Sequence, residues 1–101
     1  MRLGDCYEVH GKAISLNEVE GLLCHGTTWH PDTGWHGHCW IELNEDVVMD
    51  FSNGHHAVLR QERYYEIGKV KDVKRYTASE TRELMLKTHS FGPWNNKHKE
   101  D

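Results

Sequence analysis

The chain has 101 residues, three cysteines and a net charge of −4 at pH 7 with histidine neutral. A chain of this length forms one domain, because it can bury roughly two thirds of its unfolded surface around a single core. The negative charge argues against a nucleic-acid partner, which would select clustered lysine and arginine. No apolar run approaches ~18 residues and no signal-peptide pattern opens the sequence, so we expect a cytoplasmic protein without a membrane partner.

The three cysteines are Cys6, Cys24 and Cys39, and an odd number cannot all pair. Secreted disulfide scaffolds use an even count, so we expect reduced thiols. Cys24 and Cys39 stand beside apolar residues and are expected to be small core residues. Cys6 instead stands between Asp5 and Tyr7 in a stretch with polar and charged residues.

The first predicted element is a helix that begins at Cys6. Asp5 and Glu8 are spaced as in a capping box, which predicts a helix start between them. Backbone N–H groups and the partial positive charge at a helix N-terminus stabilise a thiolate. We therefore expect the Cys6 thiol to ionise more readily than a free thiol and to act as a nucleophile.

The next segment predicts a strand and a loop. Ser15 and Glu18 form a second capping-box pattern, and the apolar residues 22–28 are interpreted as a strand, although the same stretch is almost as compatible with a helix. Residues 29–37 contain proline and glycine and are expected to form a loop that lines or covers a cleft.

A β-hairpin is predicted next, with strands at 38–43 and 47–51 around the polar turn 44–46. Strand side chains alternate between the two faces of a sheet. Any register with an even shift therefore places His38 and Asp50 on the same face, close enough for a hydrogen bond between imidazole and carboxylate.

Two such registers are open. Pairing Leu43 with Val47 places Asp50 opposite Trp40 and diagonal to His38, whereas a shift of two residues places Asp50 directly opposite His38.

The rest of the chain supplies further elements, with a turn at 52–54, a short helix at 60–67 ending at Gly68, a strand at 69–76 and a helix from the Thr77–Glu80 capping box to about His89. Lysines in the strand at 69–76 indicate a solvated sheet edge. The pattern predicts an α+β domain over residues 1–94, with an N-terminal helix packed on a short antiparallel sheet, a C-terminal helix and a flexible tail at 95–101.

These motifs resemble a known family. The Gly4-Asp5-Cys6 helix start, the His38-x-Trp40 strand and an Asp50 that closes the next strand resemble the transglutaminase-like branch of the papain-like cysteine hydrolase superfamily, over about residues 4–54. The whole chain is also similar to short proteins of phages and bacteria that share its Cys-Tyr-Glu start and Gly-Pro-Trp close. The resemblance implies Cys6 as nucleophile, His38 as general base and Asp50 as orienting acid.

The implied function is acyl transfer through a thiol, in which an amide, isopeptide or thioester is hydrolysed or transferred. The substrate would be a peptide, a protein or a small amide, and no cofactor is expected. We expect Trp40, His36 and Trp35 to line the substrate site. Monomers and oligomers are both compatible with so short a chain, since a second copy could complete the cleft.

Two other functions remain open. His36 and His38 share a strand face, so they could hold zinc together with Cys6, Asp50 or another histidine, although the spacing matches no zinc signature. Alternatively, the chain is a binding or inhibitory protein that keeps this fold without the reaction and occupies a host protein. The remaining histidines His10, His89 and His98 are expected on the surface.

Overall fold

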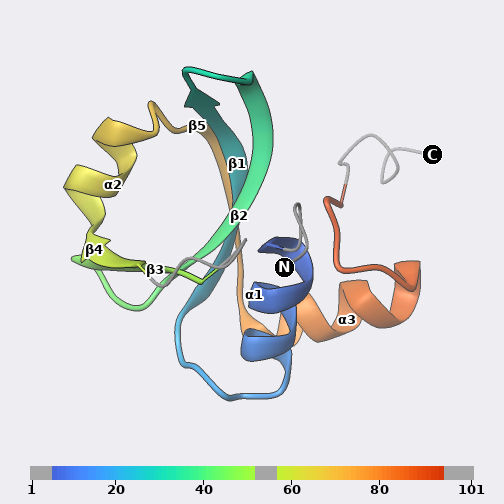
Figure 1. Cartoon of the computed structure of the whole chain (residues 1–101). Coiled ribbons are helices and arrows are strands. Elements are labelled where there is room, and N and C mark those ends of the chain that lie inside the picture. The colour runs from blue at the N-terminus through green and yellow to red at the C-terminus, as the bar shows by residue number, and fades with distance from the viewer. Residues whose placement is uncertain (1–5, 52–56, 95–101) are drawn as a thin grey trace.

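The computed structural model describes residues 6–51 and 57–94, which form an α+β fold (Figure 1). Five antiparallel strands form one sheet in the order β4-β3-β2-β1-β5. The elements in chain order are α1 (Cys6–Ser15), β1 (Leu22–His30), β2 (Gly34–Glu42), β3 (Val47–Asp50), β4 (Ala57–Arg60), α2 (Gln61–Ile67), β5 (Lys71–Tyr76) and α3 (Ala78–Thr88). The fold class is therefore the predicted one, with the N-terminal helix packed on the sheet.

Some predictions fall on residues outside those that the structure describes. These are the Asp5 cap of the first helix, the turn at 52–54 and the tail at 95–101. Among the described residues, no helix is both long and apolar enough to cross a membrane.

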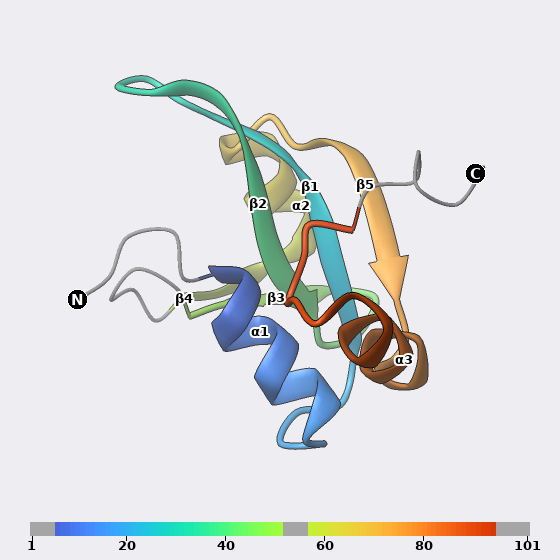
Figure 2. The same cartoon turned by 90° about the vertical axis from the view of Figure 1, so that its right-hand side faces the viewer.

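Helices cover both faces of the sheet, and each face has its own core. On one face, α1 and α3 pack over a cluster made up of Cys6, Ala13, Ile14, Leu23, Cys39, Ile41, Met49 and Trp94. On the other, α2 covers Cys24, Trp40 and Val48. Figure 2 shows the chain returning across the first face after α3, which brings Trp94 into that core. Cys24 and Cys39 are fully buried, which confirms the prediction that both are core residues.

Helix α1 ends where a second capping box was predicted, so that prediction is wrong. Asn17 adopts a left-handed conformation, with φ of 59°. The N–H of Glu18 donates to the carbonyl of Ala13 at 2.9 Å, and the N–H of Asn17 donates to Ile14 at 3.1 Å. This pair of bonds is a Schellman motif, which ends a helix. Ser15 is thus the last residue of α1.

The predicted loop at 29–37 is also wrong, because most of it is β-hairpin. β1 continues to His30 and β2 begins at Gly34, with Trp29 opposite Trp35 and Thr28 opposite His36. Cross-strand pairs of aromatic and β-branched side chains stabilise strands, and here they outweigh the glycines. Only residues 31–33 form the turn.

The second hairpin has the first of the two predicted registers. Ile41 pairs with Met49, and the N–H of Leu43 donates to the carbonyl of Val47 at 2.9 Å. The side-chain oxygen of Asn44 accepts bonds from two backbone N–H groups of the turn, at 2.7 and 3.1 Å, which closes it.

The second half of the chain follows the predicted order, with β4 as an additional strand. α2 ends at the C-cap Gly68, and β5 forms one edge of the sheet. The capping box of α3 is complete: the side chain of Thr77 accepts from the N–H of Glu80, and the Glu80 carboxylate accepts from the N–H of Thr77.

Candidate active site

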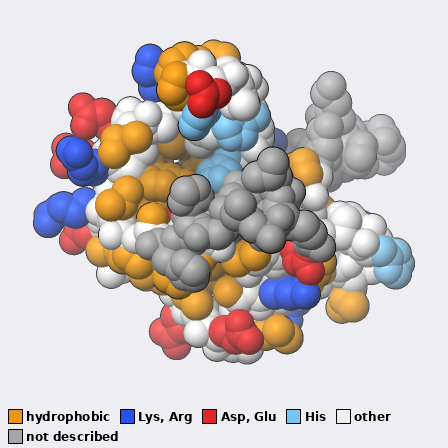
Figure 3. Space-filling model, in the orientation of Figure 1, with side chains coloured by type: hydrophobic (Ala, Val, Ile, Leu, Met, Phe, Trp, Pro, Cys, Tyr) orange, Lys and Arg blue, Asp and Glu red, His pale blue; other side chains and the backbone are white. Residues whose placement is uncertain are grey.

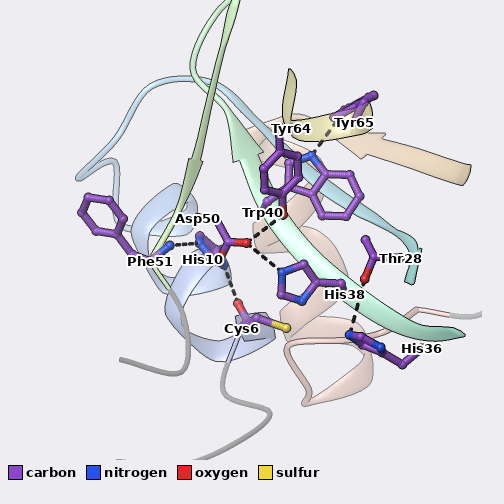
Figure 4. Close-up of polar contacts among 10 residues, drawn as sticks. All are labelled: Cys6, His10, Thr28, His36, His38, Trp40, Asp50, Phe51, Tyr64 and Tyr65. Carbon is purple, nitrogen blue, oxygen red and sulfur yellow. Dashed lines mark hydrogen bonds and ion pairs between the residues drawn. The ribbon is translucent and has the colours of Figure 1, made fainter. Parts of the chain in front are cut away.

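His38 and Asp50 meet where β3 ends. Asp50 is the last residue of β3, whereas β2 extends beyond the pairing with β3. Nε2 of His38 lies 2.8 Å from Oδ2 of Asp50 (Figure 4). Only 14% of the His38 side chain and 15% of the Asp50 side chain are exposed. The predicted hydrogen bond between these two side chains is therefore present and largely shielded from water.

Cys6 reaches the same imidazole from the opposite side of the sheet. It begins α1, and its side chain belongs to the core that contains Cys39. Because β3 ends at Asp50, the edge of β2 beside His38 is open to the N-terminus of α1, and the Cys6 thiol forms a hydrogen bond with His38. Nε2 of His38 is used by Asp50, so Nδ1 faces the thiol.

The charge state of His38 follows from these contacts. Burial by itself lowers the pKa of a histidine. Hydrogen bonds to Asp50 and Cys6, together with electrostatic interactions with both, outweigh burial and raise the pKa of His38 to about 9. The site thus favours a protonated imidazole held between a carboxylate and a sulfur.

Tyr64 is a member of this cluster that the sequence did not reveal. Its hydroxyl donates to Oδ2 of Asp50 at 2.7 Å, the same oxygen that contacts His38. Burial, followed by the charge of Asp50, raises the pKa of Tyr64, so the hydroxyl keeps its proton. A tyrosine in a short predicted helix gives no sign of which strand it will contact.

The three residues expected to contact substrate lie in different surroundings. Trp40 is fully buried and stacks on His38, with ring centroids 6.0 Å apart, and its indole N–H donates to Tyr65 at 3.3 Å. His36 is exposed, and its ring centroid lies 6.1 Å from that of His38. Trp35 is 49% exposed and lies on the opposite face of β2 from His38, under the ammonium of Lys71.

His10 is buried, not on the surface as predicted. It follows Cys6 by one helical turn, on the face of α1 that packs against the sheet. Nδ1 contacts the carbonyl oxygen of Cys6 at 2.8 Å, and Nε2 accepts the N–H of Phe51 at 3.0 Å. These two bonds require the proton on Nδ1. His10 thus links α1 to the residue after Asp50. The separation of four residues from Cys6 was the only local sign of this contact. His89 is exposed as predicted, and His98 lies outside the described residues.

A second buried histidine lies on the face of α1 and α3. His25 is 5% exposed, and neither ring nitrogen has a hydrogen-bond partner in the described part of the chain. Its ring stacks on Trp94 at 4.9 Å and contacts Tyr7 and Tyr76 edge-on at 4.8 and 5.0 Å. Burial lowers the pKa of His25 to about 4, so this ring is neutral at pH 7.

A groove of about 310 Å³ borders these aromatic rings. Tyr7 and Gly37 line one part of it, and they are the sequence neighbours of Cys6 and His38. A β-carbon on Gly37 would lie 2.9 Å from the hydroxyl of Tyr7, so glycine is needed for this close approach. One part of the groove is thus formed by the residues that precede His38 and follow Cys6 in the sequence.

The zinc alternative gains no support from residues 6–51 and 57–94. Within those ranges, no group of three or more histidine, cysteine, aspartate or glutamate side chains is placed to hold a metal ion. Histidine side chains are visible on the face of the molecule drawn in Figure 3, but they do not form such a group within the described ranges.

No protein-family model matches this chain, and neither the curated proteins nor the solved structures contain a significant match.

Proposed function

We propose that this protein is a cysteine-dependent acyl-transfer enzyme of the transglutaminase-like or papain-like type. Cys6 is the nucleophile, His38 the general base and Asp50 the carboxylate that orients the imidazole. The observation that carries the proposal is the position of the His38 ring, which bonds the thiol with one nitrogen and the carboxylate with the other. A raised imidazole pKa in this arrangement favours the thiolate–imidazolium pair.

The proposed reaction has two halves. The thiolate sulfur bonds to the carbonyl carbon of an amide, isopeptide or thioester, and the carbonyl electron pair moves to oxygen. When the oxyanion collapses, the bond to the leaving group breaks and the His38 imidazolium gives that group its proton. Water or an amine then attacks the thioester, His38 takes the proton, and Cys6 leaves as thiolate.

Two features of the fold suit this reaction. Cys6 is the first residue of α1, so its backbone N–H has no acceptor within the helix and is a candidate donor for the oxyanion beside the thiol. The groove lined by Tyr7 and Gly37, the sequence neighbours of Cys6 and His38, is a candidate place for a substrate side chain.

Alkylation by iodoacetamide tests the proposal, with mass-spectrometric assignment of each cysteine. We expect fast labelling of Cys6, complete loss of that labelling in Cys6→Ala, and slow labelling in His38→Ala. Cys24 and Cys39 are the internal controls, because burial raises the pKa of Cys24 to about 12 and that of Cys39 well above its usual value. Equal rates in the wild type and His38→Ala would contradict the proposal. Incubation with peptide amides and thioesters should then leave an acyl group on Cys6 alone.

One observation favours a second candidate, a binding or inhibitory protein that keeps this fold without turnover. Cys6 is only 3% exposed, and a nucleophile must meet its substrate. This candidate predicts that folded Cys6→Ala protein retains its function in binding a host protein, and that no substrate class acylates the wild type.

A further inference from the structure

Tyr64 and His38 contact the same carboxylate oxygen. Nε2 of His38 and the hydroxyl of Tyr64 lie 2.8 and 2.7 Å from Oδ2 of Asp50 (Figure 4). Both distances are typical of hydrogen bonds to a charged group. From these shared contacts we infer that Tyr64 is a positioning residue, which holds the carboxylate of Asp50 in the orientation that faces His38. This inference rests on the proposed function.

The path of the chain explains how Tyr64 reaches this point. β4 runs antiparallel to β3, with Ala57 opposite Asp50 and Arg60 opposite Val47. α2 begins at the next residue and returns along the sheet, so Tyr64 comes back to the level of Asp50. Its ring also packs against Trp40, with centroids 5.6 Å apart. β4 and α2 together thus bring one hydroxyl to the carboxylate.

The carboxylate needs such a contact because of its place in the fold. Asp50 is the last residue of β3, and 15% of its side chain is exposed. A carboxylate at a strand end can rotate toward water unless a second donor fixes it. When Tyr64 donates to Oδ2, rotation of the carboxylate breaks two hydrogen bonds to a charged group instead of one.

The titratable groups that face His38 come from each neighbouring element. They are Cys6 of α1, Asp50 of β3 and His36 of β2, with Tyr64 of α2 one contact further away. The hydroxyl of Tyr64 reaches His38 only through Asp50, so loss of the hydroxyl should have no effect once the carboxylate has been removed. This dependence separates positioning from a general packing role.

Tyr64→Phe in the full-length chain tests the inference, because it keeps the ring and removes only the hydroxyl. The measured quantities are the His38 pKa, from NMR titration of the imidazole, and the alkylation rate of Cys6 at pH 7. We expect the pKa to fall by about one unit and the rate to fall about tenfold, the scale of one hydrogen bond to a charged group. An unchanged or raised His38 pKa in the folded variant would overturn the inference.

Tyr65→Phe is the matched control. Tyr65 is the adjacent residue of α2, but its hydroxyl contacts Trp40 and Glu42 instead of Asp50. We expect it to leave the His38 pKa unchanged, and an equal effect of both variants would overturn the inference in favour of lost helix packing. In an Asp50→Asn background, Tyr64→Phe should cause no further change in the pKa. A wild type without His38-dependent labelling would contradict the proposed function, whereas normal labelling in Tyr64→Phe would contradict only the role of Tyr64.

Discussion

The largely buried histidines His25 and His38 lie on neighbouring strands but differ in charge at neutral pH, since His25 is neutral and His38 is protonated. His25 points toward α1 and α3 into a cluster of aromatic rings, and its pKa falls to about 4. His38 points toward the other face, between a thiol and a carboxylate, and its pKa rises to about 9. Burial disfavours the charged form of both rings. The difference shows that the partners of a buried imidazole, and not its burial, decide whether it is charged.

The positions of the two histidines along β1 and β2 place their rings on opposite faces of the sheet. In the pairing of β1 with β2, His25 lies opposite Cys39, and the next pair joins Gly26 to His38. Successive side chains point to opposite faces, so the two imidazoles are close along the sheet but separated by it. The position of each histidine along its own strand therefore sets the face on which its ring lies.

The largest expected effect is on stability at alkaline pH. His38 has a folded pKa of about 9 against 6.5 for the free side chain, so the folded state binds more protons between these values. Its contribution is fully present below pH 6.5 and is lost as the pH rises to 9, by about 3 kcal/mol. Urea unfolding at several pH values should show this loss in the wild type relative to His38→Gln. Parallel pH profiles for the two proteins would contradict the raised pKa.

Asp50→Asn should remove most of the difference in pKa between His38 and His25. Without the carboxylate, the imidazolium loses its charged partner, and we expect alkylation of Cys6 at pH 7 to slow on the order of 100-fold. Iodoacetamide labelling measures the rate, and the slow labelling of Cys24 serves as the reference. A variant that labels as fast as the wild type would show that Asp50 has no part in activating the thiol.

His25→Phe should abolish a loss of folding stability at acid pH, which is opposite in direction to the alkaline loss caused by His38. The folded pKa of His25 is about 4, below the 6.5 of the free side chain, so the unfolded state binds more protons as the pH falls through this range. Between pH 6.5 and 5 the wild type should lose about 2 kcal/mol that the variant keeps. Phenylalanine preserves the aromatic packing and leaves no unsatisfied nitrogen. Urea denaturation at pH 5 and pH 7 measures the free energy of unfolding of both proteins. Equal losses in the wild type and in His25→Phe would show that another group causes the acid sensitivity.

Local signals in the sequence were sufficient for much of the fold and for the central pair. The turn around Asn44 fixed the second hairpin, and the alternation of strand side chains then placed His38 and Asp50 on one face. The capping box at Thr77 predicted the start of α3 correctly. These patterns act over a few residues, so the physical interaction that forms the element is visible in the sequence.

The remaining features depend on contacts between distant segments. Ser15 matches a helix start as well as a helix end, and packing of α1 decided between them. The hydroxyl of Tyr64 meets Asp50 only because β4 pairs with β3, and β4 itself was not predicted. His10 was predicted on the surface, because the sequence around it does not indicate that its ring contacts Phe51, the residue after β3.

The bonds of His10 also connect the chemistry to the completion of folding. One imidazole joins the carbonyl of Cys6 to the N–H of Phe51, 41 residues further along the chain than His10 itself. The Cys6 thiol and the Asp50 carboxylate therefore come close together only after α1 has packed against the folded second hairpin. A chain still in synthesis, or one that has misfolded, would lack the contact between Cys6 and His38. On the proposed function, the alkylation rate of Cys6 would therefore report whether the chain has folded correctly.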